Sequence, residues 1–228
     1  MPRLLPPDHP QRYPMAHELH ARPFPPLTAP AQAVQLAFKP PESRERDWSE
    51  AARDHLEALI DHYGTSRPAH GASHYYGEIG RNRVKWERHT EFVSYTLFQD
   101  GATDAPFSLP VESLAPAEWL AEAPGELISA VRLHIDTAEG LRDAEDTLRD
   151  KLFKHFIPES LAGAHVAEGQ ATVFGDFRIH EDGFTRFAVI ATPRAGQRRL
   201  GRIVQRLIEI ENYRLLSMLA LPVSRSVN

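Results

Sequence analysis

The chain has 228 residues, contains no cysteine and has no long apolar run. Without cysteine it cannot form disulfides, bind zinc through thiolates or use a thiol nucleophile. This composition suits a reducing compartment. The longest nearly apolar stretch, residues 215–223, is far too short to cross a bilayer. The first ten residues hold four prolines and no apolar signal core, so we expect a cytoplasmic protein.

Composition and charge indicate an ordinary globular protein. Hydrophobic residues make up 42% of the chain, charged residues 25%, and the net charge is -5. A negative chain has no overall attraction for nucleic acid. The sequence also lacks a phosphate-binding loop, a dinucleotide fingerprint and a nucleophile elbow. We therefore expect no cofactor and no nucleic-acid partner.

Prolines are concentrated at the N-terminus, where residues 1–30 hold nine of the nineteen. Proline fixes φ and removes a hydrogen-bond donor, which excludes a helix or a central strand. The same segment carries Leu19, Phe24 and Leu27, so we expect it to pack on the body of the protein. This division predicts an arm (1–30), a body (31–192) and a long helix (193–223) that could begin a helical stalk.

Hydrophobic periodicity and turn residues predict the elements of the body. Strands are expected at 31–39, 73–79, 83–88, 91–98, 127–135, 171–179 and 184–192. Helices are expected at 43–63, 117–122, 137–156 and 193–223. Hairpins dominate over parallel crossovers, which predicts an α+β fold with a mainly antiparallel sheet and helices packed on one face.

The final helix, 193–223, combines an apolar arc with a basic stripe. Arg198, Arg202 and Arg206 in the stripe could bind an anion or a partner, or could form a solvated face balanced by nearby acids. Glu211 falls inside the apolar arc, where a carboxylate is costly unless paired, and Arg214 one turn later predicts a buried ion pair. We expect a homo-oligomer or a helical partner through this helix.

Three sets of residues are candidates for chemistry. Glu87, His89 and Glu91 alternate where one strand turns into the next, which could form an acid–base group or a polar hairpin end with ion pairs. Asp176 shares a strand face with an arginine and a histidine, which favours an ion-paired outer face. His17 and His20 could bind a metal only from a loop, because helical metal pairs need i, i+4 spacing.

Several segments together resemble a bacterial family of predicted membrane-anchored proteins, domain of unknown function 3422. They are His17–Leu27, Trp86–Phe98, Gly175–Ile190 and Gly201–Pro222. The resemblance implies a cytoplasmic N-terminal domain at the inner face of a membrane, followed by a helical region and a C-terminal anchor. Membrane contact would then come only through a C-terminal region absent from this chain. The resemblance implies no activity and no catalytic residues.

Three hypotheses of function follow. The leading one is a non-enzymatic sensing, scaffolding or oligomerisation module that works through the final helix. The second is an acid–base or metal-dependent hydrolase that uses the turn at Glu87, His89 and Glu91. The third is the soluble domain of an ion-transport assembly, because the layout implied by the resemblance is similar to that of CorA-type magnesium channels.

Overall fold

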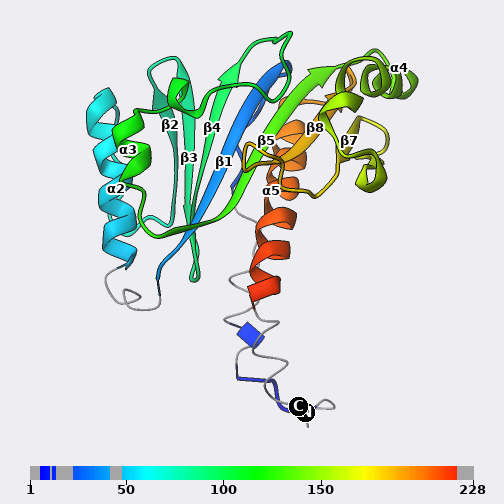
Figure 1. Ribbon diagram of the computed structural model, residues 1–228. Helices are drawn as coiled ribbons and strands as arrows, with labels where there is room; N and C mark the ends of the chain where they lie inside the picture. Colours follow the sequence, from blue (N-terminus) through cyan, green and yellow to red (C-terminus); the bar gives the residue numbers. More distant parts are fainter. Residues whose placement is uncertain (1–5, 11, 14–22, 42–47, 220–228) are drawn as a thin grey trace.

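The computed structural model describes residues 6–10, 12–13, 23–41 and 48–219. An eight-stranded sheet runs through this part of the chain in the order β2-β3-β4-β1-β5-β8-β7-β6 (Figure 1). All neighbouring strands are antiparallel except β5 and β8, which are parallel. The predicted α+β class with a mainly antiparallel sheet is confirmed. The strands are β1 (Ala31–Lys39), β2 (His74–Ile79), β3 (Asn82–Arg88), β4 (Val93–Asp100), β5 (Glu126–Thr137), β6 (Ala162–Val166), β7 (Ala171–Gly175) and β8 (Thr185–Ala191).

Four α-helices accompany the sheet in the described residues. They are α2 (Trp48–Tyr63), α3 (Ala117–Ala121), α4 (Leu141–Thr147) and α5 (Gln197–Leu219). A π-helical turn (Leu148–Leu152) follows α4, and short 3-10 turns occupy Val111–Ser113, Phe153–His155 and Pro158–Ser160. The expected long C-terminal helix is therefore present as α5. The last part of the predicted range, residues 220–223, lies outside the described residues.

Strand β1 lies in the middle of the sheet and is buried on both faces. Val34, Leu36 and Phe38 join the cluster that contains α2, whereas Ala31 and Ala33 join the cluster that contains α5. Successive side chains of a strand point to opposite faces, so α2 and α5 cover opposite sides of the sheet. This differs from the expectation of helices on one face.

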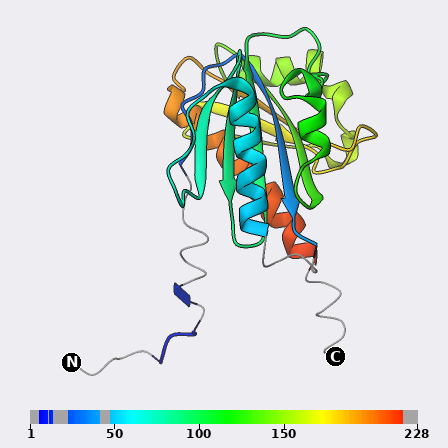
Figure 2. The same ribbon diagram turned by 90° about the vertical axis from the view of Figure 1, so that its left-hand side faces the viewer.

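Helix α2 lies against one face of the sheet (Figure 2). It meets the sheet with an apolar stripe. Ala52, Leu56 and Leu59 recur at helical spacing and are fully buried. They pack with Trp86 of β3 and Leu97 of β4, both of which are also fully buried. The expected helix 43–63 is present from Trp48, and residues 42–47 lie outside the described residues.

Helix α5 packs its first turns on β5 and β8 and on the end of the proline-rich segment. Leu27 is buried beside α5, and its backbone N–H donates to the Gln197 carbonyl at 3.1 Å. Gly201 is required at this contact, because a Cβ there would lie 1.9 Å from the Pro25 carbonyl oxygen. The helix begins at Gln197 rather than at residue 193, because Ala195 N–H closes a turn onto the Thr192 carbonyl at 2.9 Å.

The segment after β5 differs most from the expected elements. A helix was expected over 137–156 with Thr137 as its cap, but β5 continues to Thr137, which pairs with Ala191 of β8. Helix α4 begins only at Leu141 and gives way to the π-helical turn at Leu148. Thr137 therefore lies in the strand, paired in parallel with β8, and cannot cap a helix.

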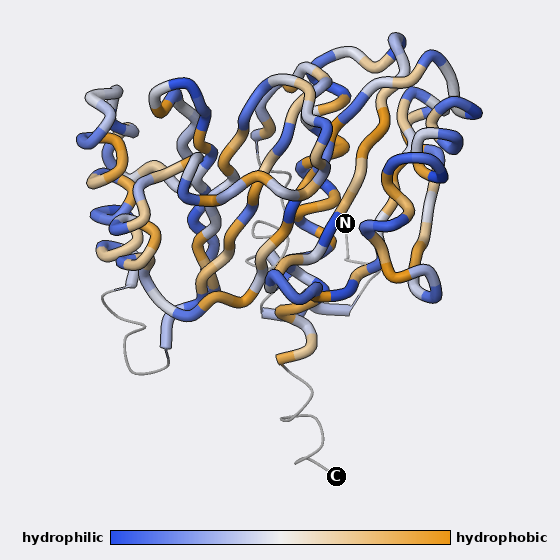
Figure 3. Tube along the Cα trace, turned by 45° about the horizontal axis from the view of Figure 1, so that its top comes forward, coloured by the Kyte–Doolittle hydropathy of each residue, from blue (hydrophilic) through white to orange (hydrophobic). Residues whose placement is uncertain are grey.

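Apolar residues are concentrated along the central strands and on the inner sides of the helices (Figure 3). Within the described ranges, none of the helices is both long enough and apolar enough to span a bilayer.

Candidate functional site: the polar interface of the C-terminal helix

The face of α5 that meets the sheet changes from apolar to polar along its length. Leu200, Val204 and Ile208 are apolar and buried, but Gln205, Glu211 and Asn212 of the same face are also buried. Buried polar groups are costly unless they are hydrogen-bonded. Each of these side chains has a partner on the sheet or on α5, as described below.

Gln205 connects α5 to an ion pair on β3. Lys85 Nζ lies 2.8 Å from Glu87 Oε2, and both side chains are almost fully buried. Lys85 also donates to Gln205 Oε1, while Gln205 Nε2 lies 3.4 Å from Glu87 Oε2 and 3.0 Å from Glu209 Oε1. Neither Lys85 nor Gln205 was expected as part of a site. The sequence feature that could have indicated them is a polar residue, lysine or glutamine, at a position that faces inward.

The three residues of the predicted acid–base group at the end of β3 lie in three different environments. Glu87 is engaged with Lys85, as above. The His89 ring stacks on Phe92 at 4.0 Å and meets the Tyr213 ring edge-on at 6.3 Å. Glu91 is exposed. The described contacts therefore divide the three side chains between an ion pair, an aromatic stack and solvent.

Glu211 and Arg214 form a bidentate ion pair on α5. Arg214 Nε and Nη2 each lie 2.8 Å from a Glu211 carboxylate oxygen, and the Thr185 hydroxyl donates to Glu211 Oε1 at 2.9 Å. The Glu211 side chain is fully buried, whereas Arg214 is 37% exposed. The hydrogen bond to Glu211 raises the pKa of Arg214 above its ordinary value. The pair therefore holds a carboxylate against β8 without leaving it unpaired.

Further along the same face, Asn212 joins the central strand. Gln35 Nε2 donates to Asn212 Oδ1 at 3.2 Å, and the Ser129 hydroxyl lies 3.4 Å from Gln35 Oε1. This small network ties β1, β5 and α5 together at one point.

Asp176 lies just beyond β7 rather than on a strand face. The expected strand 171–179 ends at Gly175, and Phe177 takes a left-handed φ of 54°. The buried Asp176 carboxylate accepts from Ile157 N at 2.9 Å, from Arg178 N at 3.2 Å and from His180 Nε2 at 2.9 Å. Asp176 thus organises the loop after β7, and its hydrogen bonds go to Ile157, Arg178 and His180 rather than to Glu87 or His89.

The arginine stripe of α5 is divided between two environments. Arg198 and Arg202 line a hollow of about 930 Å³ at the start of the helix, together with Arg194 and Arg199. Arg206, one turn further on, instead pairs with Glu209 at 2.7 Å. Arg202 also lies over the Phe24 ring at 5.0 Å. The residues expected to act together, Arg198, Arg202 and Arg206, therefore do not share one site.

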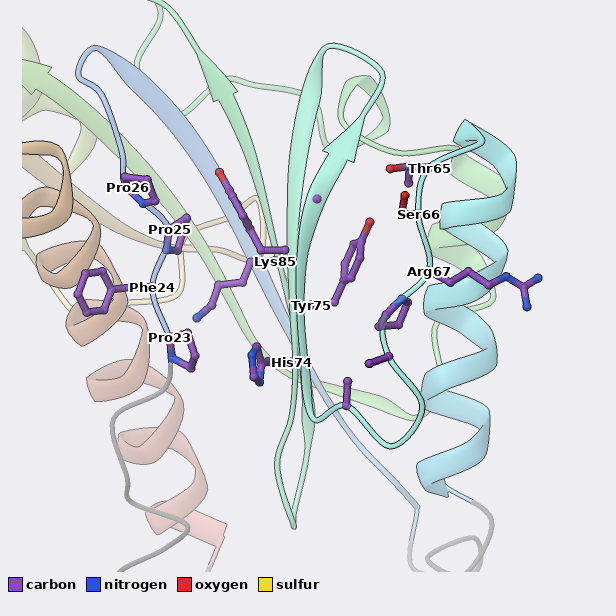
Figure 4. Close-up of a pocket in the computed structure, with 15 residues that line it drawn as sticks. Pro23, Phe24, Pro25, Pro26, Thr65, Ser66, Arg67, His74, Tyr75 and Lys85 are labelled. Atoms are coloured by element: carbon purple, nitrogen blue, oxygen red, sulfur yellow. The ribbon is translucent and has the colours of Figure 1, made fainter.

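A second hollow, of about 730 Å³, opens between the proline-rich segment and β2 (Figure 4). Pro23–Pro26 line one side, the loop after α2 lines the other, and Lys85 reaches into it from β3. The lining is mainly apolar. No local pattern in the sequence indicates this hollow, because its walls come from segments about fifty residues apart.

On the face of the sheet that points away from α5, His134 of β5 is buried beside β8. Its Nε2 lies 3.7 Å from Asp136 Oδ2, and burial lowers its pKa despite that carboxylate. Burial also lowers the pKa of the nearby His155. The Phe107 ring lies between them, 5.9 Å from the His134 ring and 5.7 Å from the His155 ring. These histidines favour the neutral form and contribute to packing.

The predicted metal candidates, His17 and His20, lie outside the described residues. Across the ranges that the structure does describe, no three His, Asp or Glu side chains gather as a metal site would require.

These observations define an α+β domain whose long last helix is joined to the sheet by buried polar groups. The chain matches the model of a family described as "Protein of unknown function (DUF3422)" over residues 7–228. It therefore belongs to this family, as the resemblance indicated. No curated protein and no solved structure matches it.

Proposed function

We propose that the chain is a non-enzymatic scaffolding module that associates with a second copy of itself through the end of α5. The observation that carries this proposal is the apolar arc of α5, which continues past its contacts with the sheet (Figures 1 and 3). At 100° per residue, Leu215, Met218 and Leu219 fall on the same side as Leu200 and Ile208. Met218 is 54% and Leu219 51% exposed.

Neighbouring side chains enlarge this apolar surface. Phe177 and Ile179, from the loop after β7, are exposed, and Arg214 lies over the Phe177 ring at 5.8 Å. Exposed apolar side chains that gather in this way are typical of protein–protein contacts. Pairing about a two-fold axis would cover the surface on both copies at once, because each copy supplies the same patch.

The geometry gives less support to a hydrolase. An acid–base mechanism needs two titratable groups within reach of one substrate. Glu87 is held by Lys85, and Glu91 is exposed on the turn. A symmetric ion-transport assembly would also associate through α5, with parallel helices. We further propose a cytoplasmic location, with any membrane contact made through a region C-terminal to this chain.

The test is the mass of the purified chain by light scattering. We expect wild type to have twice the 25.7 kDa mass of one chain, and the double variant Met218→Glu, Leu219→Glu to be a monomer. The matched control is Ile210→Glu, Ser217→Glu, which adds the same charge to exposed positions on another side of α5. The control should remain a dimer. A monomeric wild type, or a dimer that tolerates both variants equally, would overturn the proposal.

A further inference from the structure

The hollow at the start of α5 is lined by cations, and none of the described residues in its lining is acidic. Arg194, Arg198, Arg199 and Arg202 contribute four guanidinium groups, and Gln170 from the turn between β6 and β7 lines the other side. All four arginines are exposed. The hollow of about 930 Å³ has the size of a site for a small molecule.

Within the described part of the chain, these four arginines form no ion pair, unlike the other two arginines of α5. Arg206 pairs with Glu209, and Arg214 pairs with Glu211. Among the residues that the structure describes, no carboxylate pairs with any of the four around the hollow. The Arg202 guanidinium lies over the Phe24 ring, 5.0 Å from its centroid. The lack of pairing is notable in a chain whose acids outnumber its lysines and arginines by 31 to 26.

This concentration of charge is unfavourable in the free protein. Like charges repel, and the start of a helix carries a partial positive charge that disfavours cations. No acidic residue occurs in the first turn of α5 to offset it. An anion in the hollow would relieve both effects. The adjoining hollow shares Arg194 but contains Glu139 and Glu168, which limits the cationic region to one side.

We propose that this hollow binds a phosphoryl group of a small phosphorylated molecule or a phospholipid headgroup. Guanidinium groups present several N–H donors in a planar fork that matches the oxygens of phosphate. Several separate forks around one hollow suit a multiply charged oxyanion better than a single carboxylate, which has only two oxygens to share. This inference concerns the beginning of α5 and is independent of self-association through its end.

The test measures binding of inorganic pyrophosphate to the whole chain by calorimetry. The triple variant Arg198→Gln, Arg199→Gln, Arg202→Gln should weaken binding by about tenfold or more, because charge-assisted hydrogen bonds are lost. The matched control is Arg206→Gln, which removes a cation from the same helix outside the hollow and should bind like wild type. Without ligand, the triple variant should melt at a higher temperature than wild type, because the repulsion is removed, which also shows that it folds.

A second arm distinguishes the two sources of the phosphoryl group. The chain is sedimented with vesicles of phosphatidylcholine alone or with a phosphoinositide added. Binding of pyrophosphate without vesicle binding identifies a soluble ligand, and binding to the phosphoinositide vesicles alone identifies a headgroup. The inference is overturned if the triple variant binds both probes as well as wild type does. It is also overturned if, for wild type, neither probe gives a binding signal above that of sodium chloride added at the same ionic strength.

Discussion

The two faces of the sheet are covered in different ways. On one face, α2 rests on fully buried apolar side chains such as Leu56, Trp86 and Leu97. On the other, the middle of α5 meets the sheet through Gln205, Glu211 and Asn212, each hydrogen-bonded. Apolar burial is non-directional and scales with area, whereas buried hydrogen bonds have fixed partners. The α2 face therefore supplies stability, and the α5 face also fixes where the helix lies.

The two kinds of contact respond differently to mutation. Removing a methyl group from the α2 face loses packing in proportion to the atoms lost. Removing one member of a buried polar pair leaves the other without a partner in a poorly solvated place. Small chemical changes on the α5 face should therefore have effects out of proportion to their volume.

The largest expected effect is on the ion pair of α5. Arg214→Met leaves the buried Glu211 carboxylate with only the Thr185 hydroxyl, which should lower the free energy of unfolding by about 3 kcal/mol at pH 7. The double variant Glu211→Gln, Arg214→Met should recover part of this loss, because it removes the unpaired charge. The control, Leu56→Ala on the α2 face, should cost about 3 kcal/mol through lost packing. Urea denaturation measures all three variants.

An equal loss for Arg214→Met and for the double variant would contradict the assignment of a buried charge to Glu211. It would leave packing of the arginine stem, over the Phe177 ring, as the source of the effect.

A smaller effect is expected at the contact between β1 and α5. Gln35→Leu or Asn212→Leu alone leaves a buried amide without its partner and should cost about 1–2 kcal/mol. The double variant replaces both amides by apolar groups, so it should be less destabilised than the sum of the single variants. A double-mutant cycle from urea midpoints measures the difference. Strict additivity would show that the 3.2 Å contact contributes nothing.

The comparison also explains how far the sequence predicts the structure. The apolar periodicity of α2 and the alternation of β1 to β5 are local signals, and both produced the expected elements. Strand β6 was not expected, because its residues are small and mostly exposed and show no apolar face. The parallel pairing of β5 with β8 also escaped prediction, because it joins segments about fifty residues apart.

The candidate site divides in the same way. Glu211 and Arg214 lie one helical turn apart, so their contact follows from local geometry. Lys85 and Gln205 are 120 residues apart, and only the position of α5 on the sheet brings them together. Arg206 was grouped with Arg198 and Arg202 by spacing, but its pairing with Glu209 separates it from the hollow.

The smallest expected effect concerns the one titratable group of the α2 stripe. His55 Nδ1 lies 2.8 Å from the Tyr95 hydroxyl, its Nε2 lies 2.8 Å from the Trp119 carbonyl oxygen, and its ring stacks on Trp119 at 4.3 Å. Burial lowers the pKa of His55 below its ordinary value, although the Trp119 carbonyl and Glu122 act to raise it. The α2 face is thus apolar except at a histidine that favours its neutral form.

Because its pKa is lower in the folded state, His55 binds fewer protons there than in the unfolded chain. Its contribution to stability is therefore complete above about pH 6.5 and is lost as the pH falls through the folded pKa. His134 and His155 add to the same slope, since burial lowers the pKa of both. His55→Gln should reduce the slope between pH 7.5 and pH 5.5 by at most about 1.4 kcal/mol per pH unit. The control His62→Gln, at an exposed position on the same helix, should leave it unchanged. If both variants follow the wild-type slope in urea denaturation, the α2 face is insensitive to pH and its contrast with the α5 face is sharper than proposed.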